Sequence, residues 1–130
     1  MSCVLVDSSA WIDFFRGNAQ AVARIDILLA EDRAATIDLV IAEVTSGART
    51  RALFDELSRH FAALPRPRTP DDLWARVAER RFALARQGTQ AHLVDLAIAL
   101  SAADAGHRLL TRDRDFVAIA KVTALDLEIF

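Results

Sequence analysis

The sequence predicts an α/β sandwich, in which a short, mainly parallel central sheet is flanked by helices. Two observations favour this fold class. Short apolar runs alternate along the chain with longer amphipathic segments, which is typical of strands that alternate with helices. The chain has 130 residues, of which 53% are hydrophobic, enough for one domain with a core and too few for two. We therefore expect a single domain over residues 1–130.

The first half of the chain predicts two strands and four helices. A continuous apolar run that ends at Asp7 is typical of a short buried strand, and a serine after it can cap a helix that Gly17 stops. The helix signal of Leu39–Ala48 is weakened by β-branched residues. The signal of Ala52–Leu64 is clearer, because its apolar residues recur at helical spacing. The expected elements are a strand at Cys3–Val6, a helix capped by Ser8 or Ser9 and ending at Phe15, a helix at Ala19–Ala30, a strand at Ala34–Ile37, and helices at Leu39–Ala48 and Ala52–Leu64.

In the second half, the proline-rich segment Pro65–Pro70 interrupts the helices. A long helix that starts at Thr69 or Asp71 and stops near Gly88 follows it. Its expected buried positions are Leu73, Trp74, Val77, Phe82 and Leu84. A helix at His92–Ala105 ended by Gly106, a strand at Arg108–Thr111 and a last strand at Leu125–Phe130 complete the prediction.

Composition excludes several classes of protein. A formal net charge of −2 argues against a generally basic nucleic-acid binder. Every basic residue except Lys121 is an arginine, which suits bidentate phosphate contacts but equally reflects genome composition. Cys3 is the only cysteine, so no internal disulfide and no cysteine zinc cluster can form. Without a basic leader segment or an apolar stretch of about 18 residues, we expect a cytoplasmic protein with no membrane contact.

Four acidic residues stand beside apolar runs: Asp7, Glu43, Asp95 and Asp113. A carboxylate near an apolar interior is costly unless it is paired or binds a cation. Asp7 and Asp113 follow predicted strands and Asp95 lies in the first turn of a helix, so these side chains can meet at the carboxyl edge of the sheet. Each acid alone also has an ordinary interpretation, as a turn residue, a helix-dipole partner or part of a solvated helix face.

Clustered carboxylates repel one another and therefore protonate or recruit cations. Hard oxygen ligands select Mg²⁺ or Mn²⁺, ions that support phosphodiester hydrolysis. The chain contains no GxxxxGK[ST] sequence for cradling a nucleotide, which argues against kinase chemistry.

The sequence segments around these acids resemble those of a known family. Val4–Phe15, which reads VLVDSSAWIDFF, is similar to the opening of PIN-domain ribonucleases, in particular the VapC-type toxins of bacterial toxin–antitoxin pairs. Ile41–Gly47, Val94–Ala99 and Leu109–Phe116 resemble the later acidic segments of that family, in the same order and across nearly the whole chain. The resemblance implies a PIN-like α/β/α sandwich.

The resemblance also implies roles for individual residues. One or two Mg²⁺ or Mn²⁺ ions would be held by Asp7, Glu43, Asp95 and Asp113, and would activate a water to attack an RNA phosphodiester. Hydroxyls that orient these carboxylates would come from Thr111 and from Ser8 or Ser9, and Asp115 would assist. The implied partners are RNA, for which the family suggests transfer RNA, and a VapB-type antitoxin. An amphipathic antitoxin segment and a second copy of the chain would contact the helices at Trp11–Phe15 and Ala52–Leu64.

Several other side chains have two interpretations. Arg112 and Arg114 flank Asp113, so they can contact RNA phosphates, neutralise the acidic site or form surface pairs, and Arg16 and Arg49 are similar candidates. The aromatic residues that fit core packing or a dimer interface better than base stacking are Trp11, Phe14 and Phe15. The histidines show no metal-ligand spacing; they are His60, His92 and His107. Closeness in sequence to Asp95 is the one observation that favours a general-base role for His92.

Other functions remain as alternatives to an enzyme of the toxin type. A non-catalytic PIN-like module that binds protein or RNA would keep the same fold. A phospho-signalling receiver needs an acid pair after the first strand and a suitably placed lysine, whereas Ser8 and Ser9 follow Asp7 and Lys121 is misplaced. A haloacid-dehalogenase-like phosphatase needs a second aspartate at the position of Ser9.

Overall fold

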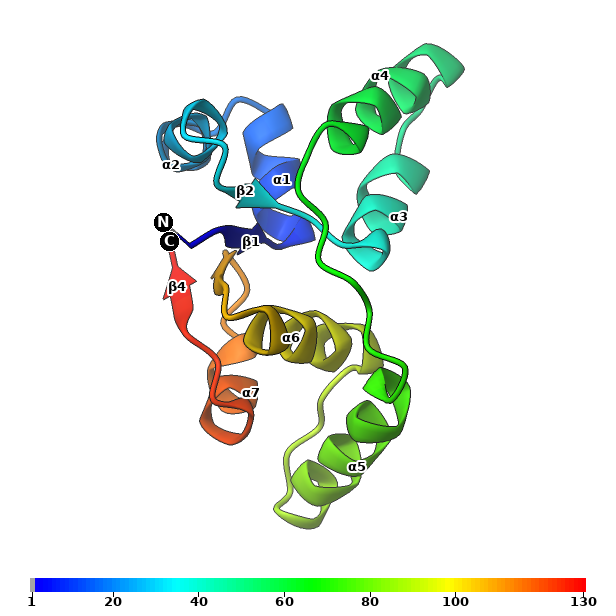
Figure 1. Ribbon diagram of the computed structural model, residues 1–130, viewed down its shortest axis with the longest axis vertical. Helices are drawn as coiled ribbons and strands as arrows, with labels where there is room; N and C mark the ends of the chain where they lie inside the picture. Colours follow the sequence, from blue (N-terminus) through cyan, green and yellow to red (C-terminus); the bar gives the residue numbers. More distant parts are fainter. Residues whose placement is uncertain (1) are drawn as a thin grey trace.

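The computed structural model describes residues 2–130 and has a four-stranded parallel sheet with helices on both sides (Figure 1). The strands are β1 (Val4–Val6), β2 (Ala34–Ala35), β3 (Arg108–Thr111) and β4 (Leu127–Ile129). The helices are α1 (Ser8–Phe15), α2 (Ala19–Ala30), α3 (Asp38–Ser46), α4 (Arg51–Ala62), α5 (Leu73–Arg86), α6 (Leu93–Ala105) and α7 (Phe116–Thr123). The predicted α/β class with a mainly parallel sheet is confirmed.

The strands lie in the order β2-β1-β3-β4, and every neighbouring pair is parallel. Leu5 in β1 lies opposite Ala35 on one side and Leu109 on the other. The strand β1 is a continuous apolar run, and Leu109 and Leu110 of β3 are fully buried, because helices cover both faces of the sheet. The chain leaves β1 toward β2 and later returns to β3 on the other side of β1. The carboxyl ends of β1 and β3 therefore form a topological switch point, where ligands bind in open α/β sheets.

The helix α6 lies at the centre of the molecule, between the sheet and α5 (Figure 1). Its residues Leu96–Ala102 are buried without interruption, because α3, α5, α7 and β3 all contact this helix. A helix that is apolar on all sides belongs in the interior of a protein. The packing fixes α6 relative to β3, and with it Asp95 in the first turn of the helix.

Two predicted helix starts were wrong. The N-cap of α1 is Asp7, and neither Ser8 nor Ser9 caps the helix, because both hydroxyls are hydrogen-bonded to carboxylates. The N-cap of α5 is Asp72, so the helix begins later than Thr69 or Asp71 and has no side-chain cap.

Three strands are shorter than predicted, and the first of them, β1, begins at Val4 instead of Cys3. The strand β2 ends at Ala35, because the N–H of Thr36 donates to the carbonyl of Pro65 at 3.0 Å instead of continuing the sheet. The last strand, β4, is confined to Leu127–Ile129, whereas the prediction covered Leu125–Phe130.

The helix α7 has no counterpart among the predicted elements. It has eight residues, lacks a side-chain cap and contains β-branched residues at Val117, Ile119, Val122 and Thr123. These features give a weak local helix signal. The helix forms against α6, where Phe116 and Ile119 are buried, so tertiary packing supplies what the local sequence lacks.

The predicted burial of α5 was partly wrong. Leu73, Val77 and Leu84 are buried, but Trp74 is 51% exposed and Phe82 is 61% exposed. Successive residues of an α-helix are rotated by about 100°. Phe82 is therefore turned about 180° away from Leu73, whereas Val77 and Leu84 stay within about 40° of it.

The aromatic residues of α1 and α4 form one cluster. Trp11 is fully buried and packs edge-on against Phe61, with ring centroids 5.3 Å apart. Phe14 is partly buried, while Phe15 stacks on Trp11 and remains 42% exposed. Trp11 is thus a core residue, as one of its two interpretations predicted. Within residues 2–130, none of the helices has both the length and the apolar character needed to span a bilayer.

Candidate metal centre

Asp7 lies at the switch point, directly after β1. Its backbone N–H donates to the carbonyl of Leu110 at 2.9 Å, which extends the pairing of β1 with β3 by one residue. The side chain is only 5% exposed, and Oδ2 accepts hydrogen bonds from Ser9 Oγ at 2.7 Å and Thr111 Oγ1 at 2.9 Å. No basic side chain of residues 2–130 forms an ion pair with it. The buried carboxylate is held by hydroxyls and lacks a cationic partner.

Two hydroxyls connect Asp7 to the loop after β3. Thr111 Oγ1 donates to Asp7 and accepts the backbone N–H of Asp113 at 3.0 Å. Ser9 Oγ likewise donates to Asp7 and accepts the N–H of Arg112 at 3.1 Å. Since a hydroxyl has one proton, both protons are used on Asp7 Oδ2. The 3.2 Å contact between the two hydroxyl oxygens then carries no hydrogen bond of its own.

Three carboxylates converge in front of α6. One oxygen each of Asp95, Asp113 and Asp115 lies within 4.8 Å of the others. Asp113 and Asp115 lie in one loop, which a local hydrogen bond holds: the backbone N–H of Asp115 donates to Asp113 Oδ1 at 2.9 Å. Oxygen ligands lie about 2.0–2.1 Å from Mg²⁺, so opposite ligands are about 4.2 Å apart. The donor atoms and their spacing therefore fit a hard divalent cation after small side-chain rotations.

The charged form of Asp95 is destabilised by its surroundings. Burial first, and then the charges of Asp113 and Asp7, raise the pKa of Asp95 from its ordinary value of 3.8 to about 6. His92 opposes this shift, and Glu43 adds to it. The other three acids singled out in the sequence thus all raise the pKa of Asp95. Such repulsion is what a bound cation would relieve.

Glu43 approaches the site from α3. Its Oε1 accepts a hydrogen bond from Ser8 Oγ at 2.6 Å, and its side chain is otherwise exposed. Neither Glu43 nor Asp7 belongs to the group of three converging carboxylates, whereas Asp115 does. The sequence indicated only an assisting role for Asp115, because the spacing along the chain does not reveal that the turn after Asp113 folds back beside Asp95.

The two arginines beside Asp113 differ. Arg112 Nη1 lies 2.9 Å from Asp13 Oδ2, without the alignment needed for a hydrogen bond, and its guanidinium lies 5.6 Å from the centroid of the Phe130 ring. Arg112 is therefore engaged in a surface pair. Arg114 is exposed and forms no ion pair with any described residue. No histidine or cysteine belongs to the group of converging ligands.

A groove adjoins the acidic site. It has a volume of 630 Å³ and lies between α1, α3 and α4. Apolar side chains, among them Ile12, Phe15 and Leu53, line it together with Arg16 and Arg49. Glu43 also lines the groove, so a molecule bound there would reach a residue of the acidic site.

Comparison with known proteins identifies the family. The PIN domain matches residues 4–122. The chain is 32% identical to ribonuclease VapC11 of Mycobacterium tuberculosis and to the VapC ribonuclease Mb1587 of Mycobacterium bovis, over 98% of this chain and 98% of each relative.

Solved structures agree in fold. DNA-bound VapBC from Salmonella typhimurium has a TM-score of 0.79 at 19% identity, covering 99% of this chain and 98% of that one. VapBC2 from Rickettsia felis, bound to a promoter DNA fragment, has a TM-score of 0.78 at 16% identity, with 98% of both chains covered. A toxin–antitoxin complex from Klebsiella pneumoniae has a TM-score of 0.65 at 27% identity, with 89% and 92% covered.

A parallel sheet with acidic side chains gathered at its β1/β3 switch point defines the class as a PIN domain. The chain belongs to this family and, within it, to the VapC ribonuclease homologues of VapBC toxin–antitoxin systems. The family resemblance found in the sequence is confirmed.

Proposed function

We propose that this protein is the toxin of a toxin–antitoxin pair and acts in the cytoplasm as an Mg²⁺- or Mn²⁺-dependent endoribonuclease. The observation that carries the proposal is the convergence of carboxylates on Asp95. The charges of these carboxylates help to raise the pKa of Asp95 to about 6. Within residues 2–130, no arginine or lysine forms an ion pair with any of them. A site of uncompensated carboxylates is made to hold a cation. The 32% identity to proteins named VapC ribonucleases supplies the substrate class.

The carboxylates that would hold the metal are Asp7, Glu43, Asp95 and Asp113, with Asp115 as a further oxygen donor beside Asp95. When bound, Mg²⁺ or Mn²⁺ supplies a Lewis acid that lowers the pKa of a coordinated water and offsets the charge of the phosphodiester.

The other residues position these carboxylates. Thr111 and Ser9 hold Asp7 Oδ2 in one orientation and anchor the backbone on either side of Arg112. Ser8 restrains Glu43 through its 2.6 Å hydrogen bond. Arg114, exposed next to Asp113, would contact an RNA phosphate, whereas Arg112 must first leave Asp13 to do so.

The groove between α1, α3 and α4 supports an antitoxin partner. An amphipathic segment with apolar side chains toward Ile12, Phe15 and Leu53 would fill it. A basic side chain of that segment would reach Glu43 and compete with the cation for the acidic site. The partners we propose are thus an RNA substrate, which the family suggests is transfer RNA, a VapB-type antitoxin and a second copy of this chain.

A cleavage assay tests the enzyme. Purified wild type and Asp95→Asn are incubated with total bacterial RNA, with Mn²⁺ or with EDTA. We expect discrete cuts by the wild type with Mn²⁺, none in EDTA, and none by Asp95→Asn under either condition. Cleavage that persists in EDTA would refute the metal mechanism. Absence of cleavage by folded, antitoxin-free wild type would favour the non-catalytic binding module.

A second readout separates metal binding from activity. Mn²⁺ should raise the melting temperature of the wild type, since a ligand bound only to the folded state adds about 2.7 kcal/mol of stability at a concentration of 100 times Kd. The shift should be much smaller for Asp95→Asn. Equal shifts in the two proteins would place the metal elsewhere.

A further inference from the structure

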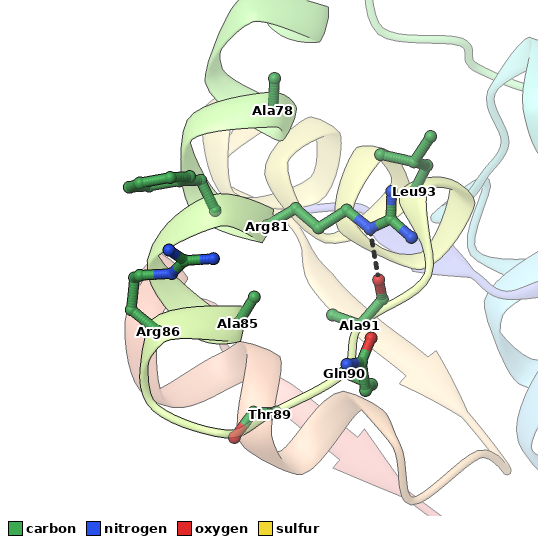
Figure 2. Close-up of a pocket in the computed structure, with 9 residues that line it drawn as sticks. Ala78, Arg81, Ala85, Arg86, Thr89, Gln90, Ala91 and Leu93 are labelled. Carbon is green, nitrogen blue, oxygen red and sulfur yellow. Dashed lines mark hydrogen bonds between the residues drawn. The ribbon is translucent and has the colours of Figure 1, made fainter.

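The last turns of α5 border a hollow that contains none of the carboxylates of the acidic site. The hollow has a volume of 350 Å³ and lies between α5, the loop after it and the start of α6 (Figure 2). Pockets that bind small ligands have volumes of about 300–1,000 Å³, so this one has room for a planar ring. Its apolar lining consists of Ala78, Phe82, Ala85, Ala91 and Leu93.

Phe82 offers an aromatic surface at this hollow. The sequence predicted this residue to be buried, but its side chain is 61% exposed, more than any other large hydrophobic side chain of residues 2–130. The guanidinium of Arg86 lies over the ring, 4.7 Å from its centroid. Unpaired nucleobases stack on exposed aromatic rings and on the planes of arginine side chains. The pair therefore provides both kinds of stacking surface at one place.

Arginines without acidic partners surround the hollow. Residues 78–93 contain Arg80, Arg81 and Arg86 but only one acidic residue, Glu79. Within residues 2–130, none of these three arginines forms an ion pair. The end of α5 is therefore locally positive in a chain whose formal net charge is −2. Unpaired arginines in a locally positive surface are complementary to the phosphates of a nucleic acid.

The beginning of α5 has a different character. Trp74 is also exposed, at 51%, but Asp71 and Asp72 precede it. Arg76 is paired with Asp72 and with Asp104 of α6, so its charge is already compensated. Phosphates would meet carboxylates at this end of the helix. The charge pattern therefore confines an RNA surface to the last turns of α5.

The hollow also contains polar groups. Thr89 and Gln90 line it from the loop after α5 (Figure 2). The amide of Gln90 has both donors and an acceptor, so it can pair with the edge of a base. Arg81 reaches across the hollow, where its Nε donates to the carbonyl of Ala91 at 3.2 Å. This bond engages Nε alone, so the Nη groups can meet a phosphate.

The hollow and the acidic site flank the same helix start. Leu93 lines the hollow and is the first residue of α6, and Asp95 follows two residues later in the same turn. These two residues are about 3 Å apart along the helix axis and point about 200° away from each other. The exposed His92 precedes both, and its charge acts on Asp95. A single strand bound at the acidic site would reach the hollow by passing over His92.

We propose that the hollow at the end of α5 is a stacking subsite for single-stranded RNA. One unpaired base next to the cleaved phosphodiester would stack on Phe82 and Arg86. Its edge would pair with Gln90, and Arg80 and Arg81 would contact the adjoining phosphates. The inference rests on the proposed ribonuclease function, because it assigns a second contact to the same substrate. The subsite would bind and position the RNA without taking part in the chemistry.

RNA binding without cleavage tests the stacking surface. Fluorescence anisotropy measures the affinity of the full chain, carrying Asp95→Asn, for a random-sequence single-stranded RNA of about 12 nucleotides. Adding Phe82→Ala should weaken binding about tenfold, because it removes one stacked base. Phe82→Trp should keep the affinity, whereas Phe82→Leu should lose it, since leucine is apolar but has no aromatic face. Circular dichroism checks that each variant folds.

The matched control is Phe54→Ala. Phe54 is another exposed ring with an arginine over it, because the guanidinium of Arg51 lies 5.2 Å from its centroid, but it belongs to α4. Its removal should leave the RNA affinity unchanged.

Salt dependence tests the arginines. Arg80→Gln and Arg81→Gln should each reduce the slope of log K against log salt concentration by about 0.7, the value for one phosphate contact of a single strand. Phe82→Ala should weaken binding without changing this slope, because stacking releases no counterions. Arg51→Gln, on the exposed surface of α4, is the control and should leave the slope unchanged. A purely structural effect of the substitutions would not separate slope from affinity in this way.

Cleavage separates the subsite from the enzyme. In the otherwise wild-type chain with Mn²⁺, Phe82→Ala should raise the protein concentration that gives half-maximal single-turnover cleavage about tenfold. The maximal rate should stay the same. Cleavage by the wild type together with unchanged RNA affinity of the Phe82→Ala variant would refute the subsite and leave the ribonuclease in place. Binding through Phe82 without any cleavage would refute the enzyme and leave the subsite.

Two other outcomes would overturn the proposal. Equal RNA affinities of Phe82→Leu and Phe82→Trp would show that the ring does not stack on a base. A Phe82→Ala variant that keeps its RNA affinity but changes its oligomeric state in sedimentation equilibrium would assign the hollow to a protein contact.

Discussion

Thr111 shows at the residue scale how a hydroxyl can organise an acidic site. It is fully buried at the end of β3, where its Oγ1 donates to Asp7 and accepts from the N–H of Asp113. One side chain therefore ties the carboxylate of Asp7 to the backbone of Asp113, which is 106 residues away in sequence. Groups of this kind orient metal ligands and tune their basicity.

Thr111→Val should impair both activity and stability. Valine keeps the shape of threonine but leaves the N–H of Asp113 and one lone pair of Asp7 without a partner. We expect RNA cleavage to fall about 10–100-fold and the free energy of unfolding to fall by about 1–3 kcal/mol. Single-turnover cleavage and urea unfolding measure the two effects. Thr111→Ser keeps the hydroxyl and is the matched control, so an equal loss in Thr111→Ser would contradict the hydrogen-bonding role.

Asp95 makes the stability of the metal-free protein depend on pH. The pKa of its carboxyl in the folded chain is about 6, above the ordinary value of 3.8, so the folded chain binds more protons than the unfolded chain between these values. The contribution of this group to stability is therefore gained as pH falls through 6 and lost as pH rises.

Replacing Asp95 should remove this dependence. In EDTA at pH 8, Asp95→Asn should melt at a higher temperature than the wild type, because the ionised carboxylate is repelled by its neighbours. At pH 4.5 the difference should shrink, since wild-type Asp95 is then protonated. Melting curves at both values, with Asp26→Asn on the exposed surface of α2 as control, give the comparison. A constant difference between wild type and Asp95→Asn would show that this carboxyl does not titrate near pH 6.

At the scale of elements, α4 contributes to the fold through one face. Phe61 is fully buried against Trp11, while Phe54 on the same helix is 36% exposed and lies beneath the guanidinium of Arg51. The same residue type therefore occupies two environments within one helix. The difference shows which face of α4 carries the packing and which is available to a partner.

Phe61→Ala should destabilise the protein by about 3–5 kcal/mol, because it removes a fully packed ring and leaves a cavity beside Trp11. Phe54→Ala should cost about 1 kcal/mol, since part of that ring already faces water. Urea unfolding of the two variants measures the contrast. Similar losses in both would mean that the α1–α4 cluster is not the packing centre of this part of the molecule.

At the scale of the whole molecule, the groove beside α4 and the exposed aromatic side chains of α5 lie far apart. The helix α4 and the helix α5 stand at opposite ends of the long axis in Figure 1, with the sheet and α6 between them. The groove beside α4 opens toward Glu43, and the exposed Trp74 and Phe82 of α5 lie at the other end. A segment bound in the groove would therefore leave this face of α5 uncovered.

Leu53→Glu tests whether the groove binds the antitoxin. Leu53 lines the groove and is 40% exposed, so a carboxylate there should oppose an apolar segment without damaging the core. We expect binding of the cognate antitoxin to weaken at least about tenfold, equal to 1.4 kcal/mol, while RNA cleavage by the isolated toxin is unchanged. Isothermal titration and the cleavage assay measure the two. Unchanged antitoxin affinity would move the partner to another surface.

Local pattern was sufficient for much of the fold. Apolar runs that end in acidic residues located β1 and β3, and Gly106 marked the end of α6. These features depend on burial and backbone preferences within a few residues, so they can be read without knowing the rest of the molecule. The same runs placed Asp7 and Asp113 at strand ends and Asp95 in the first turn of a helix, where the structure has them.

Other features depended on contacts between distant segments. The helix α7 forms because α6 covers it, and Trp74 and Phe82 stay exposed because only one side of α5 meets α6. The hydroxyls of Ser8 and Ser9 turn to Glu43 and Asp7 instead of capping α1. Asp115 joins Asp95 because a turn folds back.

The sequence by itself therefore determined the class of fold, the family and the residues from which an acidic site can be built. Only the tertiary structure decided which carboxylates meet, which hydroxyls hold them and which apolar side chains remain for partners. The physical reason is the distance along the chain over which each kind of interaction acts. Strand and helix signals act over a few residues, whereas charge repulsion at Asp95 and exposure on α5 arise from segments that meet only after the chain has folded.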